Sequence, residues 1–240
     1  MPPPTSPRAK PSTPVTFAIL PIKRFAASKA RLEGELSDGT RRALTEAMMT
    51  DVLMALRRTQ GLTVVLLITS EPAAEAIGRG YGATVLLDDF NAGQSAATSI
   101  GIEHAIEAGA RRVLLVPGDC PALDPAELTA LLATEAPGRS VVIVPDRHGS
   151  GTNALLLAPP NAIEPAFGPD SRALHERAAT AAGVGFVVAQ VPTLALDVDT
   201  VDDLDALRGA LATRRGGAAH TRGMLSRFAN SRSVPVQDGS

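Results

Sequence analysis

Residues 113–123 read Val-Leu-Leu-Val-Pro-Gly-Asp-Cys-Pro-Ala-Leu, a short apolar run that stops at an aspartate. An apolar run of this length, bounded by Pro and Gly, is typical of a buried β-strand. The next residues, Asp124-Pro-Ala-Glu127, carry the N-cap signals of a helix. Because ligands bind at the carboxyl ends of strands in open α/β sheets, Asp119 lies where a binding site is expected.

The same alternation of strand and helix patterns extends in both directions from this stretch. The predicted strands cover residues 15–20, 63–69, 84–87, 112–116, 140–145, 153–158, 186–190 and 194–196. The predicted helices cover residues 37–58, 72–80, 95–108, 125–134, 171–182 and 201–211. Strands that alternate with helices indicate βαβ units, so we expect a single α/β domain at residues 15–212 with a mainly parallel sheet.

The composition restricts the class of protein. Apolar residues make up 45% of the 240 residues, yet aromatic residues only 3%, so the core must consist of Ala, Val, Leu and Ile, as in parallel sheets covered by helices. The single cysteine, Cys120, excludes an internal disulfide and fits a reducing cytosol. It has no histidine motif nearby, so we interpret it as a packed side chain. The chain contains neither an apolar run of about 20 residues nor a signal peptide, so we expect a cytoplasmic protein without membrane contact.

The two ends of the chain differ from the body. Residues 1–14 hold six of the 19 prolines, which predicts a disordered leader. Residues 213–240 are rich in Gly, Ser and Arg, which predicts a disordered basic tail, dispensable for folding and activity. Because the formal net charge is only −2, these basic ends leave an acidic body. An acidic body without a basic, aromatic stripe argues against nucleic acid as the main partner.

A second acidic strand end lies far downstream, at residues 196–200, Leu-Asp-Val-Asp-Thr. Alternate residues of a strand share a face, so Asp197 and Asp199 should point together about 7 Å apart. Acids at strand ends often only cap the following helix, but both following helices have N-cap signals of their own. We therefore expect Asp119, Asp197 and Asp199 to hold divalent cations against phosphate oxygens.

A basic loop follows the first predicted strand, at residues 20–32, Leu-Pro-Ile-Lys-Arg-Phe-Ala-Ala-Ser-Lys-Ala-Arg-Leu. Basic surface loops are common, but cations at this place suit a triphosphate, and we expect Lys23, Lys29 and Arg31 to neutralise one. The loop contains neither GxGxxG nor GxxxxGK[ST], which argues against a dinucleotide cofactor and against an ordinary P-loop.

Three further turns are candidate ligand contacts. Gly93 and Ser95 open a predicted helix, where they would contact a base or sugar, unless Ser95 only caps the helix. The turns at residues 148–153, His-Gly-Ser-Gly-Thr-Asn, and 167–171, Phe-Gly-Pro-Asp-Ser, present unpaired amides that suit an anion or form plain turns. The four histidines have no ligand or triad spacing, and none is assigned a role.

Taken in order, the motifs of residues 15–211 resemble those of the guanylyltransferases of deazaflavin (coenzyme F-420) biosynthesis. The resemblance rests on Pro-Ile-Lys-(x)5-Lys-x-Arg-Leu, Gly-Asp-Cys-Pro-Ala-Leu, Gly-Ser-Gly-Thr-Asn, Phe-Gly-Pro-Asp-Ser and Asp-Val-Asp-Thr. It implies a three-layer αβα fold like that of nucleotide-diphospho-sugar transferases, with GTP as donor and Mg²⁺ as cofactor. Thr152, Gly168 and Ser171 would bind the acceptor, and the three aspartates would bind the metal.

The resemblance also implies the reaction. A small phosphorylated carboxylic acid attacks the α-phosphorus of GTP and pyrophosphate leaves; phosphoenolpyruvate is preferred here over 2-phospho-L-lactate and 3-phospho-D-glycerate. The unstable product would pass to the next enzyme of the pathway, and a homodimer stays open. Two alternatives remain at this point. One is another nucleotidyltransferase of the same fold, of the molybdenum-cofactor guanylyltransferase or sugar-phosphate cytidylyltransferase type, and the other is a non-catalytic nucleotide-binding domain.

Overall fold

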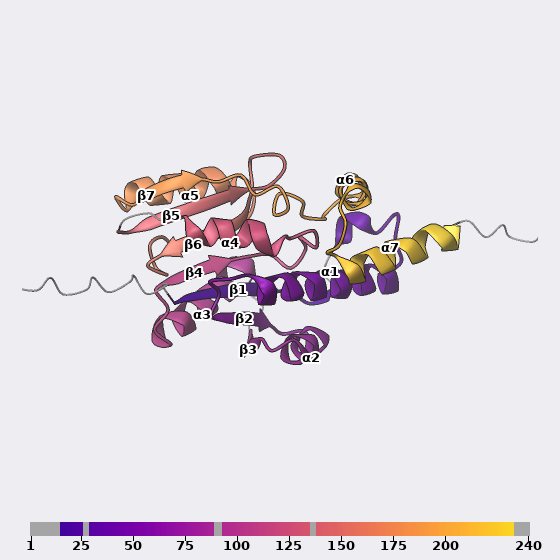
Figure 1. Cartoon of the computed structure of the whole chain (residues 1–240), viewed down its shortest axis with the longest axis horizontal. Helices are drawn as coiled ribbons and strands as arrows, with labels where there is room; N and C mark the ends of the chain where they lie inside the picture. The colour runs from indigo at the N-terminus through magenta and orange to yellow at the C-terminus, as the bar shows by residue number, and fades with distance from the viewer. Residues whose placement is uncertain (1–14, 26–28, 89–92, 135–137, 233–240) are drawn as a thin grey trace, which may run out of the picture.

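The computed structural model of the protein describes residues 15–25, 29–88, 93–134 and 138–232, and the predicted leader lies outside them. Seven strands form one sheet in the order β3-β2-β1-β4-β6-β5-β7 (Figure 1). Strand β6 runs antiparallel to its neighbours β4 and β5, and the other pairings are parallel, which confirms the mainly parallel sheet. The strands are β1 (Thr16–Ile22), β2 (Val64–Thr69), β3 (Thr84–Leu87), β4 (Arg112–Leu115), β5 (Ser140–Pro145), β6 (Thr152–Ala158) and β7 (Gly185–Val188).

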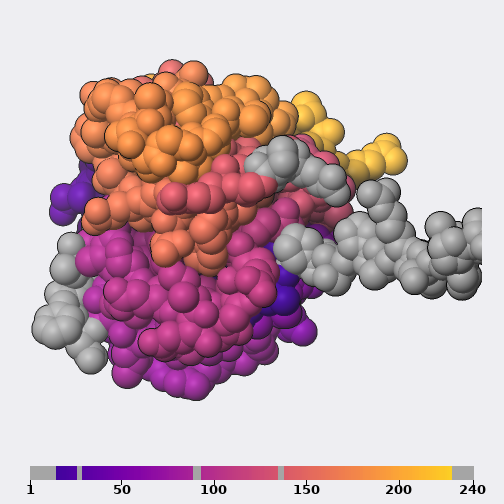
Figure 2. All heavy atoms as spheres, turned by 90° about the vertical axis from the view of Figure 1, so that its left-hand side faces the viewer, coloured from indigo at the N-terminus to yellow at the C-terminus, as the bar shows by residue number. Residues whose placement is uncertain are grey.

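Helices cover both faces of the sheet and give three layers. Along β1, Ala18 and Leu20 pack against α1 (Asp38–Arg58), α2 (Pro72–Gly80) and α4 (Pro125–Ala133). Their neighbours Phe17 and Ile19 pack on the other face, against α3 (Gln94–Glu107) and α5 (Ser171–Ala181). Figure 2 shows the later part of the chain, in orange, packed over the earlier part, in magenta, as the strand order requires. The predicted three-layer αβα fold with its aliphatic core is therefore confirmed.

A third apolar cluster lies apart from the two faces of the sheet. It joins the 3-10 helix η2 (Ala30–Leu32), α6 (Val201–Thr213) and α7 (Ala219–Arg232) to the first half of α1. Leu32, Leu44, Leu207 and Leu225 are among its buried members. The basic loop and the residues after Asp199 are thus anchored to the same small core. None of the helices in the described ranges is long and apolar enough to cross a membrane.

Helix α7 differs from the expected disordered tail. It lies beside α1 (Figure 1), and the buried carboxylate of Asp51, on α1, caps its first turn. Asp51 accepts from the backbone N–H of His220 at 3.1 Å and from that of Thr221 at 2.8 Å. Arg222 donates to the carbonyl oxygens of Leu211 and Arg214, so it caps the end of α6. The tail composition does not show these contacts, because the cap comes from a residue about 170 positions away.

The strand predicted at residues 194–196 is absent from the structure. The N–H groups of Leu194 and Ala195 donate to the carbonyl of Val191 and close a tight turn, where a strand would have paired with a neighbour. The segment is nevertheless fixed beside the expected edge of the sheet, because the Val198 N–H donates to the Asp119 carbonyl at 3.2 Å. Asp199 therefore reaches Asp119 from a loop and not from a strand end.

A β-bulge interrupts the pairing of β5 with β6. Val144 pairs with Ala154, and the next pair is Pro145 with Thr152, so Asn153 is an extra residue. Regular alternation would point Thr152 to the face on which Ala154 packs, beneath α1 and α4. The Thr152 hydroxyl instead contacts His175 of α5, on the opposite face. The bulge therefore changes the direction of a side chain at the edge where the parallel strands end.

Candidate functional site

A cavity of about 450 Å³ opens at the carboxyl ends of β1, β3 and β4. Its lining combines the basic loop, the start of α3 and the residues that follow β4, as the rule for α/β sheets predicts. Six of the predicted site residues line it: Lys23, Lys29, Arg31, Gly93, Asp119 and Asp199. A Cβ at Gly118 would lie 2.2 Å from the Ile22 Cδ1, so a side chain there would have to displace the end of the Ile22 side chain.

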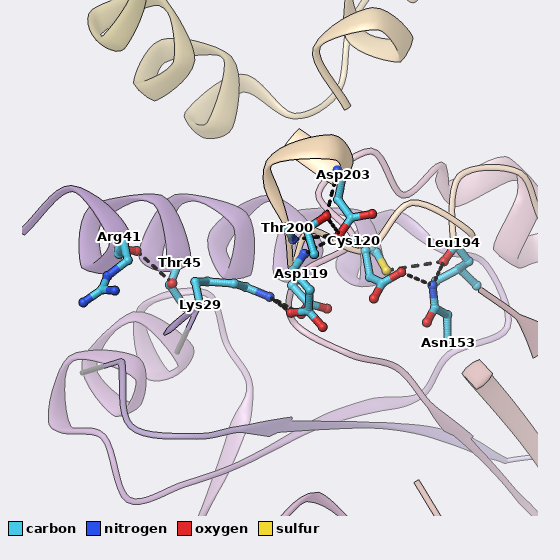
Figure 3. Close-up of polar contacts among 11 residues, drawn as sticks. Lys29, Arg41, Thr45, Asp119, Cys120, Asn153, Leu194, Thr200 and Asp203 are labelled. Carbon is cyan, nitrogen blue, oxygen red and sulfur yellow. Dashed lines mark hydrogen bonds and ion pairs between the residues drawn. The ribbon is translucent and has the colours of Figure 1, made fainter. Parts of the chain in front are cut away.

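Lys29 extends its side chain toward Asp119, where the ammonium meets the carboxylates (Figure 3). Its backbone is left-handed, with φ at 60°, and only 5% of its side chain is exposed. Its ammonium lies 2.5 Å from the Asp119 Oδ2 and 2.8 Å from the Asp199 Oδ1. One buried cation therefore bridges the carboxylates of two segments that are 80 residues apart in the sequence.

The charges of this cluster depend on one another. Burial alone would lower the pKa of Lys29, but the neighbouring Asp119 and Asp199 carboxylates outweigh it and raise the pKa well above its usual value. Lys29 is therefore a fixed positive charge at any physiological pH. The second oxygen of Asp119, Oδ1, is buried and has no hydrogen-bond partner within the described part of the chain.

Asp197 lies next to the cavity but not in its lining. Its Oδ1 accepts from the Asn153 amide at 3.0 Å, and the same amide donates to the Leu194 carbonyl at 2.7 Å. Burial, followed by the charges of Asp119 and Asp199, raises the pKa of Asp197 to about 6, although the Asn153 hydrogen bond opposes the shift. Burial and the neighbouring negative charges thus disfavour the ionised form of Asp197, and an added cation would favour it.

The loop that carries Asp199 is held by a capping box at the start of α6. Asp203 accepts from the backbone N–H of Asp199 at 3.1 Å and from that of Thr200 at 2.7 Å. Burial alone would raise the pKa of Asp203, but these hydrogen bonds and the one from Arg147 lower it. The predicted helix cap is confirmed, and it leaves the Asp199 side chain free to face Lys29.

The donor set fits a hard divalent cation only in part. No group of three or more His, Cys, Asp or Glu in the described ranges is gathered closely enough to hold a metal ion, because Lys29 takes the position between Asp119 and Asp199. The carboxylates nevertheless suit Mg²⁺, which prefers oxygen ligands. The unpaired buried Oδ1 of Asp119 is the atom that most needs a cation.

Two further cations face the cavity. Lys23 and Arg31 are exposed, and neither forms an ion pair with any residue in the described ranges. Gly93 lines the cavity with φ at 107°, a conformation that favours glycine, and it directly precedes α3. The cavity therefore offers mobile positive charge and a helix N-terminus, both of which suit phosphate oxygens.

The predicted acceptor residues form a second cluster, at the start of β6 and α5. Ser171 Oγ accepts from the Thr152 N–H at 2.9 Å, and the Ser171 N–H donates to the Gly168 carbonyl at 3.2 Å. The Gly168 backbone has φ at 135°, so a side chain there would be strained. Thr152, Gly168 and Ser171 do not line the cavity described above, but Asn153, next to Thr152, binds Asp197 and joins the two clusters.

The geometry changes the predicted role of Ser95 and agrees with the predicted role of Cys120. Ser95 does not line the cavity; its hydroxyl accepts from the Phe167 N–H at 3.2 Å, so it holds the acceptor turn. Cys120 is fully buried and lies 3.4 Å from the Leu194 carbonyl. Burial raises the pKa of its thiol well above the usual value, which agrees with a packed side chain and not with a nucleophile.

The sequence reasoning missed Asp88 and His175. Asp88 lines the cavity and is buried directly after β3, so the rule that singled out Asp119 would have found it. His175 is buried beneath Thr152, and its position in the middle of a helix gives no sequence signal.

Comparisons with known proteins agree with this geometry. A family model described as "Guanylyl transferase CofC like" matches residues 16–222. The phosphoenolpyruvate guanylyltransferase of Conexibacter woesei is 57% identical over 214 residues, which cover 89% of this chain and 96% of that protein. The 3-phospho-D-glycerate guanylyltransferase of Colwellia psychrerythraea is 35% identical over 200 residues, which cover 80% and 90%.

Solved structures support the fold alone. A putative nucleotide-diphospho-sugar transferase from Desulfovibrio desulfuricans has a TM-score of 0.68 at 15% identity, with 92% of this chain and 99% of that chain covered. A nucleotidyl transferase from Methanothermobacter thermautotroptrophicus has a TM-score of 0.60 at 19% identity, with 85% and 100% covered.

Proposed function

This chain belongs to the family of CofC-like guanylyl transferases, and on that premise we propose that it transfers GMP from GTP to phosphoenolpyruvate. Family membership makes it a nucleotidyltransferase enzyme, and the non-catalytic alternative and the other nucleotidyltransferase types are set aside. The choice of phosphoenolpyruvate rests on the relative that is named for this acid and is 57% identical to this chain over 214 residues. The relative named for 3-phospho-D-glycerate is less similar, at 35% identity.

The observation that carries this proposal is the cluster of Lys29, Asp119 and Asp199, in a cavity lined by two cations that form no ion pair within the described ranges. In the proposed reaction an oxygen of the acceptor phosphate attacks the α-phosphorus of GTP. The bond to the β-phosphate oxygen breaks, and pyrophosphate leaves with its electron pair. The attacking phosphate is already ionised at neutral pH, so no general base is needed.

The cationic side chains bring two anions together. Lys23 and Arg31 would neutralise the β- and γ-phosphates, and Lys29, fixed at its buried position, would face the reacting phosphorus. Asp119 and Asp199, with Asp197 beside them, would hold Mg²⁺, which when bound supplies further charge neutralisation at the phosphates. The Lys29 ammonium, held beside the same carboxylates, would donate to a phosphate oxygen.

Asp88 extends the proposal to the base. Asp88 follows β3, which lies three strands away from β4 in the sheet. Neighbouring strands are about 4.8 Å apart, so the ends of β3 and β4 are about 14 Å apart. That distance suits a nucleotide with its α-phosphate near Asp119 and its base near Asp88. A carboxylate accepts hydrogen bonds only, and the Watson–Crick edge of guanine offers the N1–H and N2–H donors. Asp88→Asn should therefore raise the KM for GTP more than the KM for the acceptor.

The proposed acceptor site is the turn formed by Thr152, Gly168 and Ser171. Two hydroxyls and the amides before α5 would bind the phosphate and carboxylate of the acid.

We place the reaction in the cytoplasm and in coenzyme F-420 biosynthesis, with the unstable guanosine-diphospho product passed to the enzyme that consumes it.

The test is an incubation of the full chain with GTP, Mg²⁺ and each of the three acids in turn. We expect pyrophosphate release with phosphoenolpyruvate, and slower or no release with 2-phospho-L-lactate and 3-phospho-D-glycerate. Asp119→Asn serves as the inactive control. Faster release with another acid would correct the acceptor, and release with none of them would refute the proposed reaction.

A further inference from the structure

His175 is fully buried in α5, and both nitrogens of its ring are hydrogen-bonded. Nδ1 lies 3.0 Å from the Thr152 Oγ1, and Nε2 accepts from the backbone N–H of Ala166 at 2.9 Å. The ring also meets the Phe167 ring edge-on, with 5.3 Å between the centroids. All three contacts go to the two segments that form the proposed acceptor site.

The two hydrogen bonds determine which nitrogen carries the proton. A backbone N–H can only donate, so Nε2 must be the unprotonated nitrogen. Burial lowers the pKa of His175 to about 4, so the ring is neutral at physiological pH and its one proton lies on Nδ1. His175 therefore donates to the Thr152 hydroxyl and cannot accept from it.

This assignment fixes the role of the Thr152 hydroxyl. Its oxygen accepts from His175, and its own hydrogen has no acceptor in the described part of the chain. The same holds for Ser171, whose oxygen accepts from the Thr152 N–H. Two neighbouring hydroxyls thus have hydrogens available for donation, which is the arrangement that an anionic oxygen requires.

We propose that His175 is a positioning residue for the phosphorylated acid: it fixes Thr152 as a hydrogen-bond donor and holds the Ala166–Phe167 backbone that leads into the Gly168 turn. This inference rests on the proposed function, in which Thr152, Gly168 and Ser171 bind the acceptor. It does not concern GTP, because none of the hydrogen bonds or ring contacts of His175 in the described ranges is to a residue that lines the cavity.

Three variants of the full chain separate the two hydrogen bonds. In His175→Asn the side-chain amide can replace Nδ1–H as the donor to Thr152. In His175→Gln the longer side chain can replace Nε2 as the acceptor for Ala166, but the donor to Thr152 is lost. His104→Gln, on α3, is the matched control, because His104 has no side-chain hydrogen bond within the described ranges.

The expected result is a difference between the two substrates. His175→Gln should raise the KM for phosphoenolpyruvate by about tenfold or more, as for a lost hydrogen bond to an anion, and leave the KM for GTP within about twofold. His175→Asn should retain most of the acceptor affinity, and the control should change neither value. Equal losses for both substrates, together with a lower unfolding temperature, would overturn the inference.

A double-mutant cycle with Thr152→Val completes the test. If His175 acts through the Thr152 hydroxyl, His175→Gln should add little in the Thr152→Val background, and multiplied effects would overturn the inference. If His175→Gln does not fold, His175→Asn carries the test: it should raise the acceptor KM much less than Thr152→Val does, and an equal or larger rise would overturn the inference. If Thr152→Val alone leaves the acceptor KM unchanged, the proposed acceptor site itself is wrong, and the role of His175 is refuted with it.

Discussion

Lys29→Met tests whether the buried ammonium is a structural element of the site as well as a ligand for phosphate. The substitution keeps the apolar part of the side chain but leaves Asp119 and Asp199 facing each other. At about 2.8 Å and an effective dielectric constant of about 20, each contact contributes roughly 6 kcal/mol before the cost of desolvation. Removal of one partner of a fully buried pair costs about 3–5 kcal/mol. The Asp119 and Asp199 side chains are 25% and 50% exposed, so water compensates in part and we expect about 2 kcal/mol.

The measurement is thermal and urea unfolding of the full chain without nucleotide. A loss of about 2 kcal/mol should lower the unfolding temperature by about 4–8 °C in a domain of this size. Mg²⁺ should stabilise Lys29→Met more than the wild-type protein, because in the variant the ion also replaces the missing positive charge. Lys23→Met is the matched control: Lys23 is exposed in the same cavity without an ion pair in the described ranges, so its loss should change stability by less than about 0.5 kcal/mol. Unfolding of Lys29→Met at the wild-type temperature, or an equal loss in both variants, would refute the reasoning.

Asp119→Asn should leave the chain folded, with a loss of stability no larger than that of Lys29→Met because Asp199 still pairs with Lys29, and should reduce turnover at least about a hundredfold, as for loss of a major electrostatic element; a near-wild-type rate would contradict the proposed role. A chain that ends at Thr213 lacks α7, which exposes apolar surface and removes the partners of Asp51, so urea unfolding should show a loss of about 1–3 kcal/mol. Unchanged stability would show that α7 contributes nothing to the fold. Because burial lowers the pKa of His175 to about 4, the unfolded chain binds one more proton than the folded chain between about pH 6.5 and pH 4. In this window His175 should lower the stability by up to about 3 kcal/mol as the pH falls, whereas Asp197, whose pKa burial raises to about 6, acts in the opposite direction. The wild-type chain should therefore lose more stability on acidification than His175→Asn does; identical pH profiles would contradict the assignment.

The sequence predicted most of the sheet and the edge at which the site lies, because both follow from local patterns. The apolar run before Asp119 is a strand whatever its neighbours are, and the topological rule then places the aspartate. The same reasoning correctly gathered the basic loop and Gly93 around the cavity. It also brought Thr152 and Ser171 into one cluster, through motifs and not through spacing.

The remaining features depend on contacts between distant residues. Helix α7 needs the cap from Asp51, and a tail of basic and small residues does not reveal that partner. The apolar residues at 194–196 suggest a strand, but the chain turns there, because the N–H groups of Leu194 and Ala195 bind the Val191 carbonyl. The pairing of Lys29 with two carboxylates was not foreseen either, because Lys29 lies far from both aspartates in the sequence and no local pattern gives the distance between their side chains.

The bulge at Asn153 limits how this enzyme could change its acceptor. The bulge directs Thr152 toward α5, while the extra residue, Asn153, binds Asp197. Deletion of Asn153 would make the pairing regular and leave Thr152 opposite Pro145, still directed toward α5, but it would remove the hydrogen bond to Asp197. An inserted residue would instead turn Thr152 toward the opposite face, away from His175. Natural variants and engineered libraries should therefore tolerate substitutions at the exposed residues His148 and Ser150, but not insertions or deletions at 152–153. Selectivity for a different acid would then have to arise by substitution within a turn of fixed length.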